Sequence, residues 1–223
     1  MNIEPIAYFR SPLTSKFGAP RQSGLAQSLT GQIVFQPEYR QEEALRGLDG
    51  YDYLWLIWEF SANSKAPKSL TVRPPRLGGN RRMGVFATRS PFRPNNLGLS
   101  CVAIECIDYD RTLGPIIRVS GADLIDGTPI YDIKPYVAYA DAHPDARSGF
   151  ADETVWRQLH VVIQDDVADT FSEKEAKALR EILAQDPRPQ YHNDPERIYG
   201  LSFAGREVKF RIDGDRCHVV SAM

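Results

Sequence analysis

The residues with the clearest capacity for chemistry lie in a loop at residues 89–98. Two prolines, Pro91 and Pro94, fix φ there and remove backbone donors. Arg89 and Arg93 alternate with them, so the loop is a stiff frame that holds two guanidinium groups in fixed directions. Such preorganised polar loops are typical of binding sites. The alternative is a corner of the fold whose arginines only cap carbonyl groups.

A second loop, residues 123–136, is acidic. It places Asp123, Asp126 and Asp132 among apolar residues, where carboxylates are costly unless they are paired or used. In the structural alternative, Asp126 accepts from the amides of its own turn and Asp132 pairs with Lys134. If the two loops face one another, they form a pocket suited to a zwitterionic ligand.

Charge is strongly segregated along the chain. Residues 61–104 contain no Asp or Glu but eight Lys or Arg, whereas the whole chain has a net charge of −2, which leaves −10 on the remainder. This pattern favours a polyanionic partner such as nucleic acid or polyphosphate. The alternative is a solvated basic loop neutralised by acidic neighbours in the fold.

Several common sites are excluded by their missing motifs. No GxGxxG, GxxxxGK[ST], HExxH or GxSxG pattern occurs, so neither a Rossmann nucleotide site nor a P-loop is indicated. The four histidines are scattered along the chain. We therefore expect no metal site.

The elements that position these loops are predicted to be short strands, at residues 3–9, 31–35, 53–60, 83–88, 99–107 and 116–120. The segment 53–60 is apolar on both faces, as a fully buried strand is. A short helix is predicted over residues 37–45, with Ala44 and Leu45 facing inward. Residues 67–80 lack periodicity and are predicted to be a long basic loop.

The pattern predicts a mainly β fold: an antiparallel sheet curled into a barrel over residues 1–140, followed by a small α+β domain over residues 141–223. In the second domain Ser172 and Glu175 form a capping box. The helix that follows buries Ala176, Leu179, Ile182 and Leu183 and ends at Asp186-Pro187. Residues 199–220 are predicted to return to strands.

Composition agrees with an ordinary globular protein: 223 residues, 42% hydrophobic and 25% charged. No apolar stretch is long enough to span a bilayer, and the first residues lack the pattern of a secretory signal, so no membrane partner is expected. The three cysteines are odd in number and have no CxxC spacing. A reducing, cytoplasmic location is therefore predicted.

Three ordered motifs, at residues 71–80, 84–95 and 126–136, resemble the TsaA-like (TrmO) family of S-adenosylmethionine-dependent tRNA N6-methyltransferases. The resemblance covers residues 3–140, and residues 186–210 resemble the family's C-terminal extension. It implies a barrel-like all-β methyltransferase fold, a homodimer and a cofactor held by loops. The implied reaction methylates N6 of the threonylcarbamoyl-adenosine next to the anticodon, chiefly in threonine tRNA.

By position, the resemblance implies cofactor contacts at Pro20, Arg21, Gln22, Ser61, Ala62, Arg89, Leu99, Asp123, Leu124, Ile125 and Asp126. Two departures stand out. Ser61 occupies a place where the family commonly has His, and Asn95-Asn96 replaces the usual Asn-Pro. The first removes an imidazole, and the second removes a constraint on the loop.

The residue chemistry agrees with this cofactor. Arg89 or Arg21 suits its carboxylate, and Asp126 or Asp123 suits a cationic group. Methyl transfer needs alignment of donor and acceptor and a group that takes one proton, for which the sequence leaves Asp132 and Tyr136 open.

Two rival functions remain at this point. One is a non-catalytic RNA-binding module that uses the basic loop 65–93. The other is a small-molecule phosphate-binding enzyme, which fits the arginines but leaves the acidic loop unexplained.

The predicted RNA-binding residues are Arg73, Arg76, Arg81, Arg82 and Arg93. Changing any one of the first four to alanine is expected to weaken binding of the tRNA anticodon arm and to reduce the slope of log affinity against log salt by about 1. Filter binding over a salt series measures both. An unchanged slope in all four variants would assign these arginines to internal ion pairs.

Overall fold

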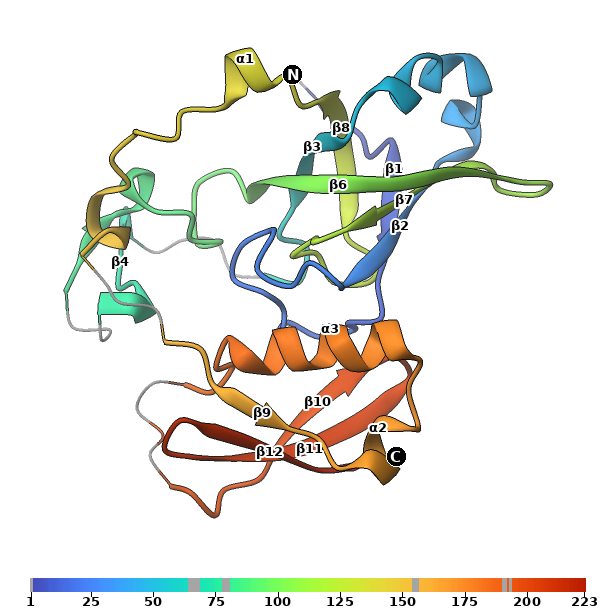
Figure 1. Ribbon diagram of the computed structural model, residues 1–223. Helices are drawn as coiled ribbons and strands as arrows, with labels where there is room; N and C mark the ends of the chain where they lie inside the picture. The colour runs from blue at the N-terminus through green and yellow to red at the C-terminus, as the bar shows by residue number, and fades with distance from the viewer. Residues whose placement is uncertain (1, 64–68, 78–80, 154–156, 190–191, 193) are drawn as a thin grey trace.

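The computed structural model describes residues 2–63, 69–77, 81–153, 157–189, 192 and 194–223. It consists of a β-barrel and a smaller sheet that is covered by a helix, α3, on the side facing the barrel (Figure 1). The prediction of a mainly β protein with a small α+β part is confirmed.

Six of the described strands close the barrel, in the order β1-β2-β7-β6-β3-β8, and every neighbouring pair is antiparallel. Side chains alternate between the interior and the outer face, as period-two geometry requires. The interior is apolar and includes Phe9, Ile33, Leu56, Ile117 and Ile130. The barrel strands are β1 (Ala7–Arg10), β2 (Thr30–Phe35), β3 (Tyr53–Glu59), β6 (Leu97–Asp110), β7 (Gly114–Ser120) and β8 (Pro129–Pro135).

The antiparallel order places alternate connections at the same end of the barrel. One end carries the β1–β2 connection (residues 11–29), the β3–β6 connection (residues 60–96) and the β7–β8 connection (residues 121–128). These three segments contain almost all of the residues selected from the sequence. The topology therefore brings loops together that are up to about a hundred residues apart in the chain.

The prediction that β3 is buried on both faces is wrong. Leu54, Leu56 and Trp58 point inward, whereas Tyr53 is 47% exposed on the outer face. A barrel strand has only one interior face, so the second row of apolar side chains, which includes Trp55 and Ile57, lies on the outside.

Three other local predictions need correction. Residues 37–45 form two short 3₁₀ helices that bury no residue, and Ala44 is exposed. Residues 83–88 are a strand only at Met83–Gly84, because a 3₁₀ turn follows at once. The described part of the predicted basic loop 67–80 contains a short strand and a 3₁₀ turn, and residues 67–68 and 78–80 lie outside the described residues.

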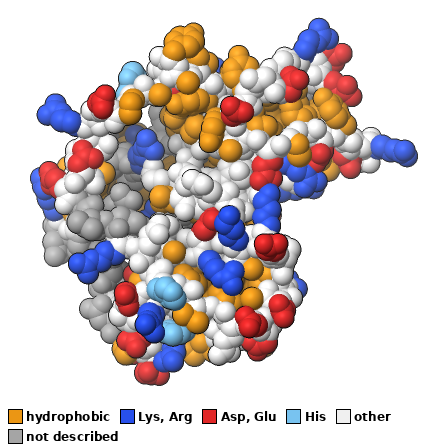
Figure 2. Space-filling view, in the orientation of Figure 1, with side chains coloured by type: hydrophobic (Ala, Val, Ile, Leu, Met, Phe, Trp, Pro, Cys, Tyr) orange, Lys and Arg blue, Asp and Glu red, His pale blue; other side chains and the backbone are white. Residues whose placement is uncertain are grey.

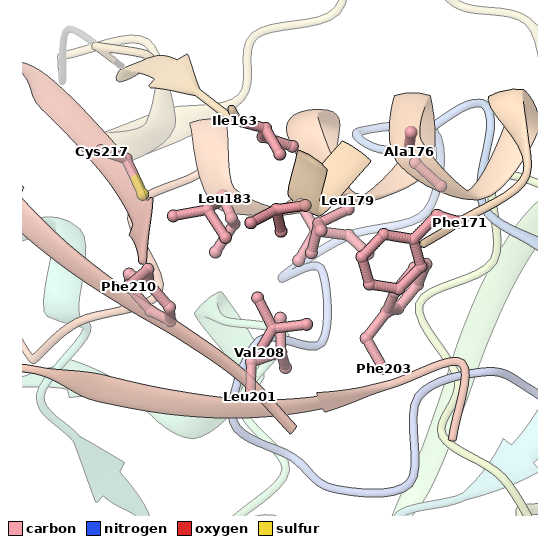
Figure 3. Close-up of a cluster of buried hydrophobic side chains, with 14 of the residues drawn as sticks. Ile163, Phe171, Ala176, Leu179, Leu183, Leu201, Phe203, Val208, Phe210 and Cys217 are labelled. Atoms are coloured by element: carbon pink, nitrogen blue, oxygen red, sulfur yellow. The ribbon is translucent and has the colours of Figure 1, made fainter. Parts of the chain in front are cut away.

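The second sheet has the order β10-β11-β12-β9 and packs one face against α3. The capping box of α3 is confirmed, with Ser172 and Glu175 bonded reciprocally. Ala176, Leu179 and Leu183 meet Leu201 and Phe210 from the sheet (Figure 3). The elements of this part are β9 (His160–Val162), α2 (Asp165–Ala168), α3 (Glu173–Ala184), β10 (Tyr199–Phe203), β11 (Arg206–Asp213) and β12 (Arg216–Ala222).

The remaining elements are short and lie in connections. They are η1 (Pro37–Tyr39), η2 (Glu42–Leu45), η3 (Leu48–Gly50), β4 (Thr71–Val72), η4 (Pro75–Leu77), β5 (Met83–Gly84), η5 (Val85–Ala87), α1 (Ala138–Asp141) and η6 (Gly149–Ala151). Within the described ranges, no helix has the length and apolar character needed to cross a membrane.

The β1–β2 connection joins the two parts of the molecule. Its Leu13, Ala26 and Leu29 are buried in the hydrophobic core of the second part, not in the barrel. The amide and hydroxyl of Ser28 both donate to the carboxylate of Glu181 on α3, at 2.7 and 2.8 Å. This connection is therefore held by the C-terminal part of the chain.

Changing Glu181 to alanine is expected to lower the free energy of unfolding by about 1–3 kcal/mol, because it leaves a half-buried amide without its acceptor. Urea unfolding measures the loss. The control is Arg180→Ala, an exposed neighbour on the same helix, for which a change within about 0.5 kcal/mol is expected. Equal changes in both variants would contradict a specific contribution from the Ser28 contact.

Candidate functional site

The candidate site lies at the end of the barrel where the three long connections meet. The β7–β8 connection is fixed there by backbone hydrogen bonds: Gly24 donates to Gly121 at 2.8 Å, and Asp126 donates to Leu13 at 2.7 Å. Both bonds join it to the β1–β2 connection. The acidic segment and the loop at residues 20–23 are therefore rigidly placed beside one another.

Arg89 reaches this pair of loops from the third connection. Its Nη1 donates to Oε1 of Gln22 at 2.6 Å, and the residue is exposed. The proline-containing loop behind it is braced by Arg93, whose Nη1 donates to the carbonyl of Thr88 at 3.0 Å. Arg93 thus has the carbonyl-capping contact that the sequence left open, while Arg89 presents its guanidinium to the site.

Asp123 is the carboxylate whose charge is stabilised by the nearby positive charge of Arg89. Its Oδ1 accepts from the hydroxyl of Ser100 at 2.5 Å. Burial raises the pKa of Asp123, and this rise is opposed by the Ser100 hydrogen bond, by the positive charge of Arg89 and by the amide of Ser23. Arg89, Gln22 and Asp123, which are up to 101 positions apart in the sequence, therefore form one polar cluster.

The other residues of the acidic segment have different surroundings. The Oδ1 of Asp126 accepts from the amide of Ser11 at 3.0 Å, so its carboxylate caps the end of β1, not its own turn. Leu124 is 1% exposed and belongs to the barrel core. The carbonyl of Ile125 accepts from Thr128. Leu124 therefore presents no accessible side chain to a ligand.

Two further segments from the resemblance adjoin the cluster. Pro20 is buried, and Arg21 Nη2 donates to the carbonyl of Asp186 at 3.2 Å, toward the C-terminal part. Ser61 and Ala62 are exposed just after β3, and the Lys16 ammonium donates to Asn63 there. This contact links the β1–β2 connection to the segment that carries Ser61.

Leu99 lies apart from the cluster within this chain. It is 56% exposed on the outer face of β6, whereas the next residue, Ser100, points into the barrel. Period-two alternation separates the two side chains. The Leu99 side chain therefore lies on the opposite face of β6 from the Ser100 side chain.

Of the two candidate proton acceptors, Asp132 lies on the outer face of β8 and Tyr136 follows directly after that strand. Asp132 is bonded to Lys134 at 3.0 Å, as in the structural alternative, and its register partner is Ile57. Tyr136 packs against Tyr53 and Trp55 near the opposite end of the barrel. The structure does not bring either side chain into the cluster of Arg89 and Asp123.

Tyr131, a tyrosine of the acidic segment that is not among the predicted site residues, lies nearer the candidate end than Tyr136. The hydroxyl of Tyr131 donates to Glu59 at 2.5 Å, and burial together with this carboxylate raises the pKa of Tyr131 to about 12. The phenol therefore stays protonated at neutral pH and is a donor, not a base.

The predicted RNA-binding arginines are only partly described. Arg73 and Arg82 are exposed, and Arg81 is exposed with an ion pair to Glu153 at 3.5 Å. Such exposed pairs contribute little energy and are readily exchanged for another anion. The side chain of Arg76 lies outside the described set.

Sequence reasoning missed Ser100 and Trp58. The indole nitrogen of Trp58 donates to Ser100 Oγ at 2.9 Å, and both residues are buried. The signal was present: Ser100 lies at an inward position of a strand that otherwise buries Gly98 and Val102. A hydroxyl at a core position needs a partner, which is a reason to suspect a nearby polar group.

Two protein-family models match this chain, and one of them spans the candidate site. The family model described as the tRNA-methyltransferase O N-terminal domain matches residues 8–142, and the model of the TrmO C-terminal domain matches residues 157–222. The chain belongs to the tRNA-methyltransferase O family. The first match covers the barrel and all three connections of the candidate site, and the second covers the α3 sheet.

Relatives within the tRNA-methyltransferase O family are similar over nearly their full length. The chain is 38% identical to the tRNA (adenine(37)-N6)-methyltransferase of Escherichia coli K12, over 94% of this chain and 92% of that protein. It is 42% identical to a putative S-adenosylmethionine-dependent methyltransferase, RcsF, of Pseudomonas aeruginosa, over 90% and 87%. The crystal structure of TrmO from Pseudomonas aeruginosa superimposes with a TM-score of 0.82 at 33% identity, covering 100% of this chain and 98% of that one.

The raised pKa of Asp123 predicts a pH-dependent stability difference between the protein and its Asp123→Asn variant. The folded protein holds the proton more tightly than the unfolded chain, so this group's contribution is fully present below its unfolded pKa and is lost as pH rises through the folded value. Without ligand, Asp123→Asn is therefore expected to melt higher than the parent near neutral pH. The difference is expected to shrink toward about pH 4.

Thermal unfolding of both proteins between about pH 4 and 8 measures this difference. Asp132→Asn is a suitable control, because that carboxylate is half exposed and paired with Lys134. A melting difference for Asp123→Asn that stays constant with pH would show that the carboxylate carries no net burial cost.

Proposed function

We propose that this protein is an S-adenosylmethionine-dependent methyltransferase that acts on N6 of adenine 37 in tRNA, and that its substrate is the threonylcarbamoyl-adenosine of threonine tRNA above all. The observation that carries the reaction is the similarity, over 94% of the chain, to a relative named for it. The finer choice of substrate rests on the motifs at residues 71–80, 84–95 and 126–136.

The cluster at the barrel end fits the proposed cofactor. S-adenosylmethionine carries a carboxylate, an ammonium and a sulfonium, and it supplies an activated methyl group when bound. Arg89 offers a guanidinium fork that suits a carboxylate. Asp123 is a desolvated carboxylate whose charge a cationic group would stabilise. The chain thus presents both signs of charge within one set of rigidly held loops.

The chain's own task in this proposal is to orient and to exclude water. The loop at residues 20–23, the segment at Ser61 and Ala62 and the backbone of residues 123–126 would surround the cofactor, with the Leu99 side chain on the outer face. Catalysis by alignment needs this rigidity more than it needs a strong base. The proposed acceptor for the proton released from N6 is Asp132 or Tyr136. By its register with Ile57, Asp132 lies nearer the candidate end.

We further propose a homodimer built on the outer face of the barrel. Hydrophobic side chains gather over the upper part of the barrel in Figure 2. Two exposed aromatic residues are Tyr53 on β3, at 47% exposure, and Tyr139 on α1, at 93%. A face of this kind on a soluble enzyme is typical of an interface. The molar mass in solution tests this proposal, and a monomer at micromolar concentration would oppose it.

The proposed partner is the anticodon arm of tRNA, held by the exposed arginines Arg73, Arg81 and Arg82 together with Arg76 and Arg93. The proposed compartment is the cytoplasm, since Cys101, Cys106 and Cys217 are all free thiols.

Mass spectrometry of tRNA nucleosides, after incubation with the protein and S-adenosylmethionine, tests the reaction. We expect a gain of one methyl group on threonylcarbamoyl-adenosine, and we expect it with a chelator present. Binding of tRNA that is unaffected by the cofactor, with no methylated nucleoside, would favour the non-catalytic RNA-binding module.

Arg89→Ala is expected to weaken S-adenosylmethionine binding by about 1.5–3 kcal/mol, the range for a charge-assisted hydrogen bond. Arg89→Lys should recover only part of this, because an ammonium does not reproduce the planar fork. Isothermal titration measures both, with the exposed Arg111→Ala as control. Unchanged affinity in Arg89→Ala would remove Arg89 from the site.

A further inference from the structure

A buried chain of two hydrogen bonds leads from the barrel interior to Asp123. The Trp58 indole nitrogen donates to Ser100 Oγ at 2.9 Å, and Ser100 Oγ donates to Asp123 Oδ1 at 2.5 Å. Trp58 and Ser100 are 5% and 1% exposed. Water therefore has little access to either donor, and the two bonds replace what solvent would supply.

The direction of each bond is fixed by the donor inventory. An indole N–H can only donate, so the Ser100 oxygen must accept from Trp58. The hydroxyl proton of Ser100 is then directed to the other neighbour, the Asp123 carboxylate. A serine hydroxyl normally rotates among several partners, but here one orientation is selected.

Trp58 is itself held firmly. Its register partner on β6 is Gly98, where a Cβ atom would lie 2.4 Å from the indole Cε2, so the ring occupies the space that any larger residue would fill. Phe60 packs edge-on against the same ring at a centroid distance of 4.3 Å. Trp58, the donor at the start of the two hydrogen bonds, is therefore closely packed within the barrel.

We propose that Ser100, oriented by Trp58, is a positioning residue that fixes the Asp123 carboxylate for the cationic group of S-adenosylmethionine. With Oδ1 committed to Ser100, rotation of the carboxylate is restricted and its second oxygen has a defined direction. Arg89 supplies the opposing charge across the same cluster. This inference rests on the proposed function and adds two residues that act through Asp123 and do not touch the reacting atoms.

A purely structural role is the competing explanation, since the same bonds satisfy polar groups inside the barrel. The two explanations differ in what happens when Asp123 loses its charge. If Ser100 acts through Asp123, removal of the hydroxyl affects cofactor binding only while residue 123 is a carboxylate. If Ser100 merely supports the barrel, its removal affects binding equally in either background.

The experiment is a double-mutant cycle read by isothermal titration with S-adenosylmethionine. Ser100→Ala is expected to raise Kd about tenfold or more in the parent, as loss of a hydrogen bond to a charged group does, and less than threefold in the Asp123→Asn background. Equal fold-changes in the two backgrounds would overturn the proposal. Absence of binding by the parent protein would instead overturn the proposed function.

The pH dependence of Kd gives a second readout. The Ser100 hydrogen bond and the charge of Arg89 both lower the pKa of Asp123, so losing the hydroxyl should move the midpoint for binding to higher pH. Val102→Ala, another inward residue of β6, is the control: it should lower the melting temperature without moving the midpoint. An unmoved midpoint in Ser100→Ala would count against the inference.

Trp58→Phe covers the case in which Ser100→Ala does not fold. It removes the indole donor but leaves the Ser100 hydroxyl, which is then free to rotate. We expect a smaller rise in Kd, again confined to the background with Asp123 intact. The same rise with Asp123→Asn would show that the barrel, not the carboxylate, responds to the change.

Discussion

The connection between two neighbouring barrel strands, β1 and β2, is anchored in the hydrophobic core of the C-terminal part, and the position of every candidate loop depends on it. The chain leaves the barrel after β1, buries Leu13, Ala26 and Leu29 beneath α3, and returns at β2. Along the way it forms the loop at residues 20–23, whose residues are buried or half-buried. Because its apolar anchors lie in the C-terminal core, this loop is held by packing that the barrel alone does not provide.

The second part of the molecule is therefore more than an appendage. Glu181 accepts two hydrogen bonds from Ser28, and the carbonyl of Asp186 accepts one from Arg21. The C-terminal part therefore holds the β1–β2 connection within the loop at residues 20–23 and again just after it. Gly18 shows how close the contact is: a Cβ atom there would lie 2.3 Å from Leu201. The proposed domain boundary near residue 140 separates two segments of the chain, and both contribute residues to the hydrophobic core of the C-terminal part.

Much of the fold followed from local pattern. The helix with Ser172 and Glu175 was predicted to its first residue because capping is a short-range interaction. The exposed outer face of β3 was not predicted, because an apolar run does not reveal whether a barrel or a partner covers its second face. The strand predicted over residues 83–88 was wrong at residues 85–87 for a similar reason, because their apolar composition is common to strands and to turns.

The site was harder to predict, since its parts meet only through topology. The charges of Arg89 and of the acidic segment were visible in the sequence, but which carboxylate faces the arginine was not. Asp126 is taken up by the amide of Ser11, a contact 115 positions away that no local rule anticipates. Asp123 is left to face Arg89, and its support comes from Ser100, which attracted no attention as a lone serine in an apolar strand.

Burying the Asp123 carboxylate costs stability, and this cost indicates a functional use for the charge. A carboxylate whose pKa is raised by burial destabilises the folded protein near neutral pH, and a neutral residue would be the more stable choice there. Trp58 and Ser100 offset only part of the cost, by giving the charge one well-directed hydrogen bond in place of water. A charge kept under those conditions is poised for a cationic ligand, whose binding would remove the remaining penalty. The unfavourable burial of the Asp123 charge would thus be offset at the point where the proposed ligand binds.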